Sequence, residues 1–254
     1  MILDRDAGRA QFDDLLKRLL DVLAAGGLLV VLSPLIAVTA VAIKLDSHGP
    51  LFYPCRRVGR GGRELRMLKF RTMHDDADGP ALTVNGDARL TRVGRFLARS
   101  KVDEIPQLWN VLKGEMSLVG PRPEDPSFVA LRPEDFEIIL RVRPGITGPS
   151  QLAFAKESEL LDPSDRLTDY LERFLPQKIA LDRLYVAQRT VRLDLSILVW
   201  TLAAVVLRRD VAVNRETIKL TRRMRPAVRL GTAPDRPLMK RNDVANHSTP
   251  QSGS

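Results

Sequence analysis

The acidic pair Asp103-Glu104 is the first candidate for chemistry, because it stands just ahead of Pro106. Proline is favoured in the first turn of a helix, so both carboxylates are expected at or just outside a helix N-terminus. In a structural interpretation, Asp103 caps the helix and Glu104 complements its dipole. In a catalytic one, the helix N-terminus attracts phosphate. A carboxylate held there beside Arg99 and a divalent metal could attack a phosphoryl group and form an acyl phosphate.

Basic residues that could bind phosphate recur around this pair. Two of them, Arg122 and Arg143, each precede a proline. Proline stiffens the local backbone, so each guanidinium is presented from a fixed base, which suits bidentate phosphate binding. The structural alternative is that these side chains are solvated charges or contacts to lipid headgroups. The full set is Lys69, Arg71, Arg99, Arg122 and Arg143.

Other kinds of site find little support in the sequence. The three histidines, His48, His74 and His247, are scattered, and the single cysteine, Cys55, cannot form an intramolecular disulfide. Gly59-Arg60-Gly61-Gly62 lacks the spacing of a dinucleotide fingerprint, and there is no Walker loop. The net charge of +9 indicates anionic partners, but only 5% of the residues are aromatic. That scarcity argues against stacking on single-stranded nucleic acid, and no nucleic-acid partner is expected.

The run from Val22 to Ile43 is uncharged and mostly aliphatic, which predicts attachment to a membrane. The acidic residues before it argue against a cleaved signal peptide. Ser33-Pro34 lies at its middle, where proline should bend or break the helix and serine can bond a freed carbonyl. A kinked spanning helix and a re-entrant helix-break-helix both remain open. Basic residues at both ends argue for the second, although the physical arguments alone leave the two level.

The rest of the chain predicts a mainly helical α+β domain with short strands. Prolines recur between 121 and 149, which indicates irregular connections around short helices. The uncharged run 195–207 is too short to span a bilayer and is expected to be buried or interfacial. The expected elements are strands over 51–58 and 64–72 around a turn at 59–62, a polar loop over 75–86, and helices over 90–100, 106–113 and 166–207.

Three parts are expected along the chain. Residues 1–46 hold the re-entrant membrane segment, and residues 47–234 form a compact catalytic domain at the membrane interface. Residues 235–254 are polar and are expected to be a disordered tail.

Several strings, taken in order, resemble the bacterial sugar transferase family, the monotopic phosphoglycosyl transferases that initiate surface-polysaccharide assembly. The resemblance is dense over about residues 15–150, and its central string is highly specific. The matching strings are Lys17–Asp21, Ser33-Pro34, Gly49–Tyr53, Lys69–Met73, Arg99–Pro123 and Val142–Gly148.

The resemblance implies that Asp103 is the nucleophile. It would take a phosphosugar from a nucleotide diphosphosugar, usually a UDP-sugar, and release the nucleoside monophosphate, UMP. Polyprenyl (undecaprenyl) phosphate would then attack this covalent intermediate in a ping-pong scheme. Glu104 would assist proton transfer or help to hold the site, and family members need Mg²⁺, with Asp103 as the matching ligand. Lys69, Arg99 and Arg143 match basic positions around the phosphates, and Arg122 lies in a matching motif.

The resemblance also implies the re-entrant geometry, with the catalytic domain on the cytoplasmic face of the bacterial inner membrane. Membrane lipids are then partners, and a homodimer is compatible with the family. The chain looks like the small form, without an extra N-terminal membrane domain. It departs from the family pattern after Gly148, where only Gln151 is kept, so sugar or base contacts there are not carried over.

A catalytically inactive membrane scaffold or regulator with the same fold is the alternative to an enzyme. The intact residues Asp103, Glu104, Lys69 and Arg143 argue against it.

Overall fold

The computed structural model describes residues 2–75, 87–155, 157–161, 165–207, 209, 211–214 and 216–222. Residues 1–223 form one compact unit. The predicted tail over 235–254 and almost all of the predicted loop over 75–86 lie outside the described residues.

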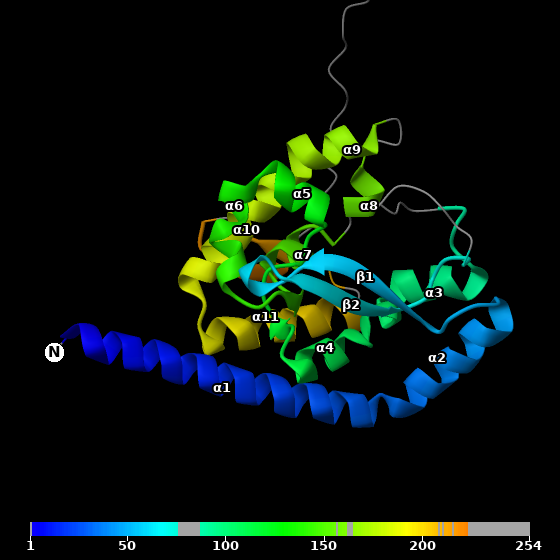
Figure 1. Ribbon diagram of the computed structural model, residues 1–254, viewed down its shortest axis with the longest axis horizontal. Coiled ribbons are helices and arrows are strands. Elements are labelled where there is room, and N and C mark those ends of the chain that lie inside the picture. Colours follow the sequence, from blue (N-terminus) through cyan, green and yellow to red (C-terminus); the bar gives the residue numbers. More distant parts are fainter. Residues whose placement is uncertain are drawn as a thin grey trace, which may run out of the picture. The chain divides into compact units, whose positions relative to one another are not determined.

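The N-terminal apolar segment folds as two helices, α1 (Ile2–Val31) and α2 (Ser33–Asp46), which are bent by 60° at the break between them (Figure 1). The predicted break is therefore confirmed. Pro34 falls in the first turn of α2, where no backbone donor is needed, and the Ser33 hydroxyl donates to the Val30 carbonyl at 2.8 Å. Among the described helices, none is long and apolar enough alone to cross a membrane, whereas this bent pair together has the required length and composition.

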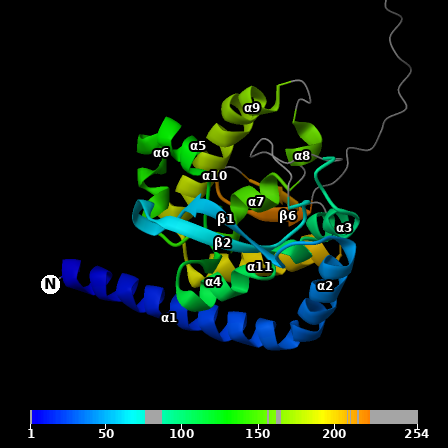
Figure 2. The same ribbon diagram turned by 45° about the vertical axis from the view of Figure 1, so that its right-hand side comes forward.

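Three polar residues in the middle of α1 attach it to the rest of the unit, along the side that faces α4 and α11 (Figures 1 and 2). The basic residues expected only to flank the membrane segment are therefore contacts within the fold. Asp21 is itself buried, and Ala25, one turn later, has no exposed surface. The bonds are Lys17 Nζ to the Val119 carbonyl (3.0 Å) and to Asp194, Arg18 to the carbonyls of Val111 (2.6 Å) and Leu112 (2.9 Å), and the Leu118 N–H to Asp21 Oδ1 (3.0 Å).

The other sides of the two helices expose aliphatic side chains to the surroundings. Contiguous apolar surface of this kind marks an interaction site with a membrane or a protein. The exposed residues include Leu23, Leu28, Val30, Val31, Leu35, Val38, Val41 and Leu45.

The longest strands form an antiparallel hairpin, β1 (Phe52–Val58) with β2 (Glu64–Phe70), in the register Phe52↔Phe70 to Val58↔Glu64. Both predicted strands are thus confirmed. Leu65 and Met67 alternate inward and are buried, as one face of a half-buried strand requires. Two further pairs were not predicted. They are the parallel pair β3 (Ser117–Val119) with β4 (Gly145–Thr147) and the antiparallel pair β5 (Val211–Val213) with β6 (Leu220–Arg222).

The predicted helices over 90–100 and 106–113 are confirmed as α3 and α4, and short proline-started helices follow as expected. The helical pattern over 166–207 is divided by a break at Arg189-Thr190, where the Thr190 hydroxyl caps the last helix. The helices are α3 (Arg92–Ser100), α4 (Gln107–Lys113), α5 (Pro126–Leu131), α6 (Pro133–Glu137), α7 (Pro149–Ala153), α8 (Glu157–Leu160), α9 (Arg166–Asp169), α10 (Leu175–Gln188) and α11 (Val191–Val206), with a π turn over Tyr170–Phe174 and 3₁₀ turns η1 (Arg60–Gly62), η2 (Val102–Glu104) and η3 (Ile139–Arg141).

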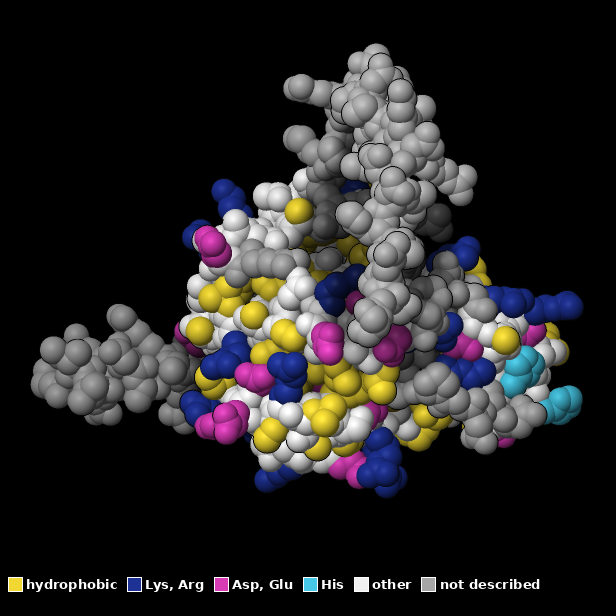
Figure 3. Space-filling view, turned by 90° about the horizontal axis from the view of Figure 1, so that it is seen from above, with side chains coloured by type: hydrophobic (Ala, Val, Ile, Leu, Met, Phe, Trp, Pro, Cys, Tyr) yellow, Lys and Arg dark blue, Asp and Glu magenta, His cyan; other side chains and the backbone are white. Residues whose placement is uncertain are grey.

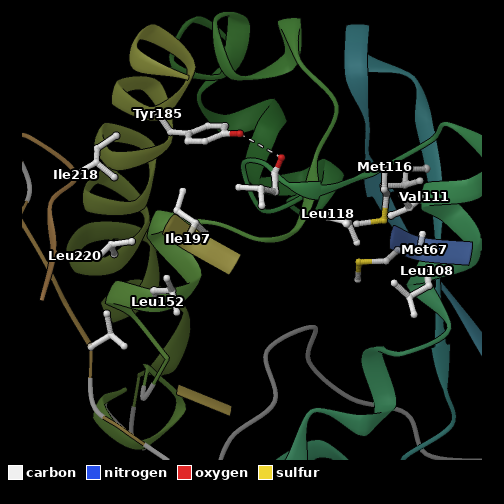
Figure 4. Packing of buried hydrophobic residues seen from close by; sticks show 14 residues of the cluster. Met67, Leu108, Val111, Met116, Leu118, Leu152, Tyr185, Ile197, Ile218 and Leu220 are labelled. Carbon is white, nitrogen blue, oxygen red and sulfur yellow. Dashed lines mark hydrogen bonds between the residues drawn. The ribbon is translucent and has the colours of Figure 1, made fainter. Parts of the chain in front are cut away.

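The main hydrophobic core joins α4, β2, β3, α10 and α11 (Figure 4). Leu108 and Val111 of α4 point into it, as their spacing predicts. Ile197 of α11 is fully buried there, while Val199 and Leu202 are exposed. This helix is therefore buried along one side, as predicted, and exposed along another; an interfacial position for the exposed side stays a prediction.

Gly94 provides a test of how tightly α3 packs. A Cβ at this position would lie 1.9 Å from the Thr72 carbonyl oxygen, so Gly94→Ala must displace the helix. We expect the free energy of unfolding to fall by about 1–3 kcal/mol. In the control Gly27→Ala, the added Cβ meets no atom of the described residues within 4 Å. Because alanine favours a helix over glycine, the free energy of unfolding should increase by up to about 1 kcal/mol. Denaturant titration in detergent measures both, and equal effects would contradict the packing argument.

Candidate active site

The acidic pair lies in the 3₁₀ turn η2, between α3 and α4. Asp103 is only 6% exposed. The residue at the N-cap of α4 is Pro106, and no side chain caps this helix. The interpretation of Asp103 as a helix cap is therefore wrong, because the intervening turn holds its carboxylate in a separate buried position.

Lys69, near the end of β2, lies between the two carboxylates. Its Nζ is 3.4 Å from Asp103 Oδ2 and 3.1 Å from Glu104 Oε1. Arg122 approaches the same Glu104 oxygen, with its Nη2 at 3.2 Å. Acidic and basic side chains thus alternate along these contacts, in the order Asp103, Lys69, Glu104, Arg122. Each buried charge therefore has an oppositely charged neighbour, which offsets part of the cost of its burial.

The two carboxyl groups differ in their electrostatic surroundings. Burial raises the pKa of Asp103, with Lys69 opposing this shift and Glu104 adding to it. Burial also acts to raise the pKa of Glu104, but the cations of Lys69 and Arg122 outweigh it and hold that pKa well below its usual range. Glu104 is therefore the firmly ionised member of the pair. Its charge also raises the pKa of Arg122.

One oxygen of the site is left open for a ligand. Asp103 Oδ1 is buried and has no hydrogen-bond partner among the described residues, which is uncommon for a buried carboxylate. No group of three or more His, Cys, Asp or Glu side chains in the described part of the chain could hold a metal ion. Mg²⁺, however, is commonly bound by one or two carboxylates together with substrate phosphates. Asp103 fits such a ligand set, which the substrate would complete.

The structure does not gather all the predicted phosphate-binding residues. Arg99, in the last turn of α3, is exposed and forms no ion pair with a described residue. Arg143 Nε donates to the Gly114 carbonyl at 2.9 Å, at the C-terminal end of α4. Since Asp103 precedes the N-terminal end and seven helical residues rise about 10 Å, Arg143 lies apart from the acidic pair. Its binding of phosphate remains a prediction.

Arg71 lies in a buried position where it contacts the backbone. Its guanidinium is buried and bonds to the carbonyls of Ser47 and His48, in the connection between α2 and β1. The hypothesis of a solvated charge is wrong for this residue, because its side chain is buried. Its Nε has no hydrogen-bond partner among the described residues, so phosphate binding by Arg71 stays a prediction.

Sequence reasoning missed a group of buried polar residues beside Arg122. Tyr170 is 2% exposed, Lys178 8% and Asp182 5%, and the same group includes Glu124 and Glu157. The available signal was the position of Lys178 and Asp182, four residues apart on the otherwise apolar buried side of α10. Charged residues are almost never buried without a partner, so such a pair indicates a polar site.

A cleft lies at the end of α2, and none of the buried polar residues beside Arg122 lines it. It is lined by both described histidines, His48 and His74, whose cyan side chains lie at one edge in Figure 3. Asp46, on the same cleft, accepts a hydrogen bond from the Val93 N–H at 2.9 Å. This bond joins the end of the helix pair to α3, the helix that leads to Asp103.

The site thus combines a buried carboxylate that has a free oxygen with two cations, Lys69 and Arg122, which together could receive an anionic group. The sequence profile of the bacterial sugar transferase family matches residues 12–208. The chain therefore belongs to the bacterial sugar transferase family and is a transferase. The resemblance found in the sequence is thereby confirmed.

Three relatives illustrate the range of the match. The UDP-glucose:undecaprenyl-phosphate glucose-1-phosphate transferase of Caulobacter vibrioides is 40% identical over 193 residues, covering 74% of this chain and 68% of that protein. The undecaprenyl-phosphate glucose phosphotransferase of Komagataeibacter xylinus is 38% identical over 202 residues, covering 76% of this chain and only 36% of that protein. The exopolysaccharide production protein PSS of Rhizobium leguminosarum is 37% identical over 202 residues, covering 76% of this chain and 96% of that protein.

Asp182 predicts a pH-dependent stability. Burial raises its pKa to about 7. An unfolded aspartate titrates near pH 3.9, so the folded chain holds this proton more tightly, and stability falls as the pH rises from about 4 to about 7. Asp182→Asn removes that titration. When the pH is raised from 5 to 8, the free energy of unfolding of Asp182→Asn should therefore increase by about 2 kcal/mol relative to that of the unmodified protein.

Asp125→Asn is the control, measured by the same denaturant unfolding at the two pH values. Burial acts to raise the pKa of Asp125, but hydrogen bonds from Ser127 together with the Arg57 cation outweigh it and lower that pKa. Its carboxylate is thus ionised at both pH 5 and pH 8, so Asp125→Asn should change the free energy of unfolding by the same amount at the two pH values. An equal change for Asp182→Asn at both values would contradict the prediction.

Proposed function

We propose that this chain transfers a phosphosugar from a nucleotide diphosphosugar, a UDP-sugar, to undecaprenyl phosphate, and so initiates the assembly of a surface polysaccharide or glycoconjugate. The names of its relatives support the donor and acceptor classes. The observation that carries the proposal is the buried Asp103 carboxyl with an open oxygen beside Lys69 and Glu104.

The first step is an attack by an Asp103 carboxylate oxygen on the β-phosphorus of the donor. The bond from that phosphorus to the oxygen shared with the α-phosphate breaks, and UMP leaves with the electron pair. An aspartyl phosphosugar remains on the protein. In the second step an oxygen of the polyprenyl phosphate attacks the same phosphorus and releases the Asp103 carboxylate. The product is polyprenyl diphosphosugar.

The neighbouring side chains prepare Asp103 for this attack. Lys69 favours the ionised, nucleophilic form of Asp103 against the effect of burial. Glu104 contacts two cations and keeps a low pKa, which favours a role in holding Lys69 and Arg122 over one in accepting a proton. Asp103 would be the protein ligand of a Mg²⁺ ion, and such an ion would neutralise charge on the leaving group. Arg99 and Arg143 remain proposed contacts to the phosphates.

We further propose that α1 and α2 form a re-entrant hairpin at the cytoplasmic face of the bacterial inner membrane. Both ends of the hairpin bond to the same compact unit, through Arg18 and Asp21 at one end and Asp46 at the other. Such attachment supports entry and exit by one face, because a spanning helix would place its ends on opposite sides. The exposed aliphatic residues of the hairpin are then lipid contacts.

The hairpin is tested by the location of a tag placed before Met1. In intact spheroplasts the tag should stay protected from an external protease and become accessible once the inner membrane is permeabilised. A periplasmic reporter protein and a cytoplasmic enzyme serve as controls for membrane integrity. Cleavage of the tag in intact spheroplasts would mean that the segment spans the bilayer.

The transfer reaction is tested by incubating detergent-solubilised protein and Mg²⁺ with a panel of UDP-sugars, without lipid phosphate. We expect a burst of UMP that approaches one equivalent for one of the sugars. Asp103→Asn should reduce the rate by at least about 1,000-fold, because the substituted amide is not a nucleophile.

Asp135→Asn, at a partly exposed position on α6, is the matched control and should keep the burst. A burst retained by Asp103→Asn would rule out the covalent mechanism. No UMP from the unmodified protein with any sugar, with or without polyprenyl phosphate, would favour the catalytically inactive scaffold.

A further inference from the structure

One side of α3 is exposed, and it carries arginines around a phenylalanine. Arg92, Arg95, Phe96 and Arg99 are all exposed, whereas Leu97 is buried on the opposite side. Their spacing of three or four residues places the four exposed side chains on one face of the helix. Phe96 itself is 67% exposed. The exposed side of α3 therefore combines positive charge with an aromatic ring.

The charges of these arginines are not balanced within the described part of the chain. Arg92, Arg95 and Arg99 form no ion pair with a described residue, and α3 contains no acidic residue. The Asp46 carboxylate, at the first turn of α3, bonds to the Val93 N–H at 2.9 Å. Cations near the first turn of a helix are opposed by its dipole, so Arg92 does not stabilise α3 by its charge. An anionic partner would offset this unfavourable position.

The buried side of α3 packs on α2, the second helix of the apolar pair, and the two helices lie beside each other in both views (Figures 1 and 2). Leu97 of α3 and Ile43 of α2 are buried in the same small cluster. Other sides of α2 expose Val38, Val41 and Leu45. The arginines of α3 therefore lie next to the helix that exposes a row of aliphatic side chains.

The surface of a bilayer that contains anionic phospholipids matches this combination of groups. Guanidinium groups bind phosphate through paired hydrogen bonds, and negatively charged lipids attract basic residues close to the surface. An aromatic ring between basic residues can enter the boundary between headgroups and acyl chains. A nucleic acid would also attract the arginines, but it offers no apolar layer for the neighbouring side chains of α2. The continuity of charge and apolar surface therefore favours lipid.

We propose that Arg92, Arg95 and Phe96 form a binding surface for the headgroups of anionic phospholipids. Arg99, in the last turn of α3, keeps its proposed contact with a substrate phosphate. The inference rests on the proposed membrane hairpin, because α3 reaches the bilayer only if α2 lies in it. It adds a second contact with the membrane, on the helix that leads to Asp103.

The position of α3 is tested with a spin label attached to Phe96→Cys, in a Cys55→Ser background and in nanodiscs that contain phosphatidylglycerol. Oxygen concentrates in the bilayer, whereas a nickel chelate stays in water. We expect the ratio of oxygen to nickel accessibility to be several-fold higher than at Leu131→Cys. Leu131 is the matched control, because it is 63% exposed on α5, on the side of the unit away from α1 (Figure 1). Equal ratios at the two positions would overturn the proposal.

A third label, on Val38→Cys, separates this inference from the hairpin on which it rests. Val38 is exposed on α2. A lipid environment at Val38 together with a lipid environment at Phe96 supports the proposal. A lipid environment at Val38 with an aqueous one at Phe96 contradicts the binding surface on α3 alone, and an aqueous environment at both contradicts the hairpin as well.

The preference for anionic lipid is tested by the thermal midpoint of the protein, without substrate, in nanodiscs of phosphatidylcholine with and without phosphatidylglycerol. A ligand that binds only the folded chain raises the midpoint. We expect phosphatidylglycerol to raise it, and salt to reduce the rise. The double variant Arg92→Gln, Arg95→Gln should lose at least half of the rise, because each arginine near an anionic surface contributes to binding. This measurement needs no cysteine substitution, so it decides the question if Cys55→Ser fails to fold.

The double variant Arg56→Gln, Arg66→Gln is the control for net charge. It removes the same charge from two exposed arginines, which pair with Glu64 in the β1–β2 hairpin. It should keep the rise in the midpoint caused by phosphatidylglycerol. An equal loss in both double variants, or no rise in the unmodified protein, would contradict a binding surface on α3.

Discussion

Two adjacent carboxylates can both stay ionised in a buried site when a cation lies between them, and Lys69 occupies that position here. Its position near the end of β2 requires the β1–β2 hairpin to be correctly registered, and the acids require the turn between α3 and α4. Arg122 adds a second cation from a third segment. Much of the fold can therefore be understood as the means of bringing these three segments to one point.

The helix pair and the site are connected through hydrogen bonds to Val119, the last residue of β3. The Val119 carbonyl accepts hydrogen bonds from Lys17 of α1 and from Tyr185 of α10 (the bond to Tyr185 is drawn as a dashed line in Figure 4). Two residues later begins the rigid segment that carries Arg122. The helix pair, the core and Arg122 are thus connected through one short stretch of backbone, and a shift of α1 would be transmitted to the site.

Several elements could be predicted from the local sequence pattern, because a few neighbouring residues determine their structure. The break at Ser33-Pro34, the two strands of the hairpin and the inward side of α4 all follow from proline geometry or side-chain periodicity. The short pairs β3–β4 and β5–β6 were missed because three-residue strands carry no periodic signal and depend on distant partners.

The residues of the site also differ in whether the local sequence or packing between distant segments determines their position. Asp103 and Glu104 were recognisable from the central family string, and Lys69 joined them as predicted. Arg143 was grouped with them by chemical type, but its carbonyl partner at the far end of α4 depends on packing between distant segments. Tyr170 and Lys178 were overlooked for a related reason: a network is defined by the groups that surround it, and residues more than 40 positions apart supply them.

The bonds from Arg18 to the end of α4 have a practical consequence for protein engineering. They supply partners to the Val111 and Leu112 carbonyls, as Asp21 does to the Leu118 N–H. Deleting residues 1–46 to obtain a water-soluble fragment would strand these groups and leave a hole where Ala25 enters the core. A soluble version is better made by keeping α1 and replacing the outward-facing aliphatic residues of the helix pair with polar ones.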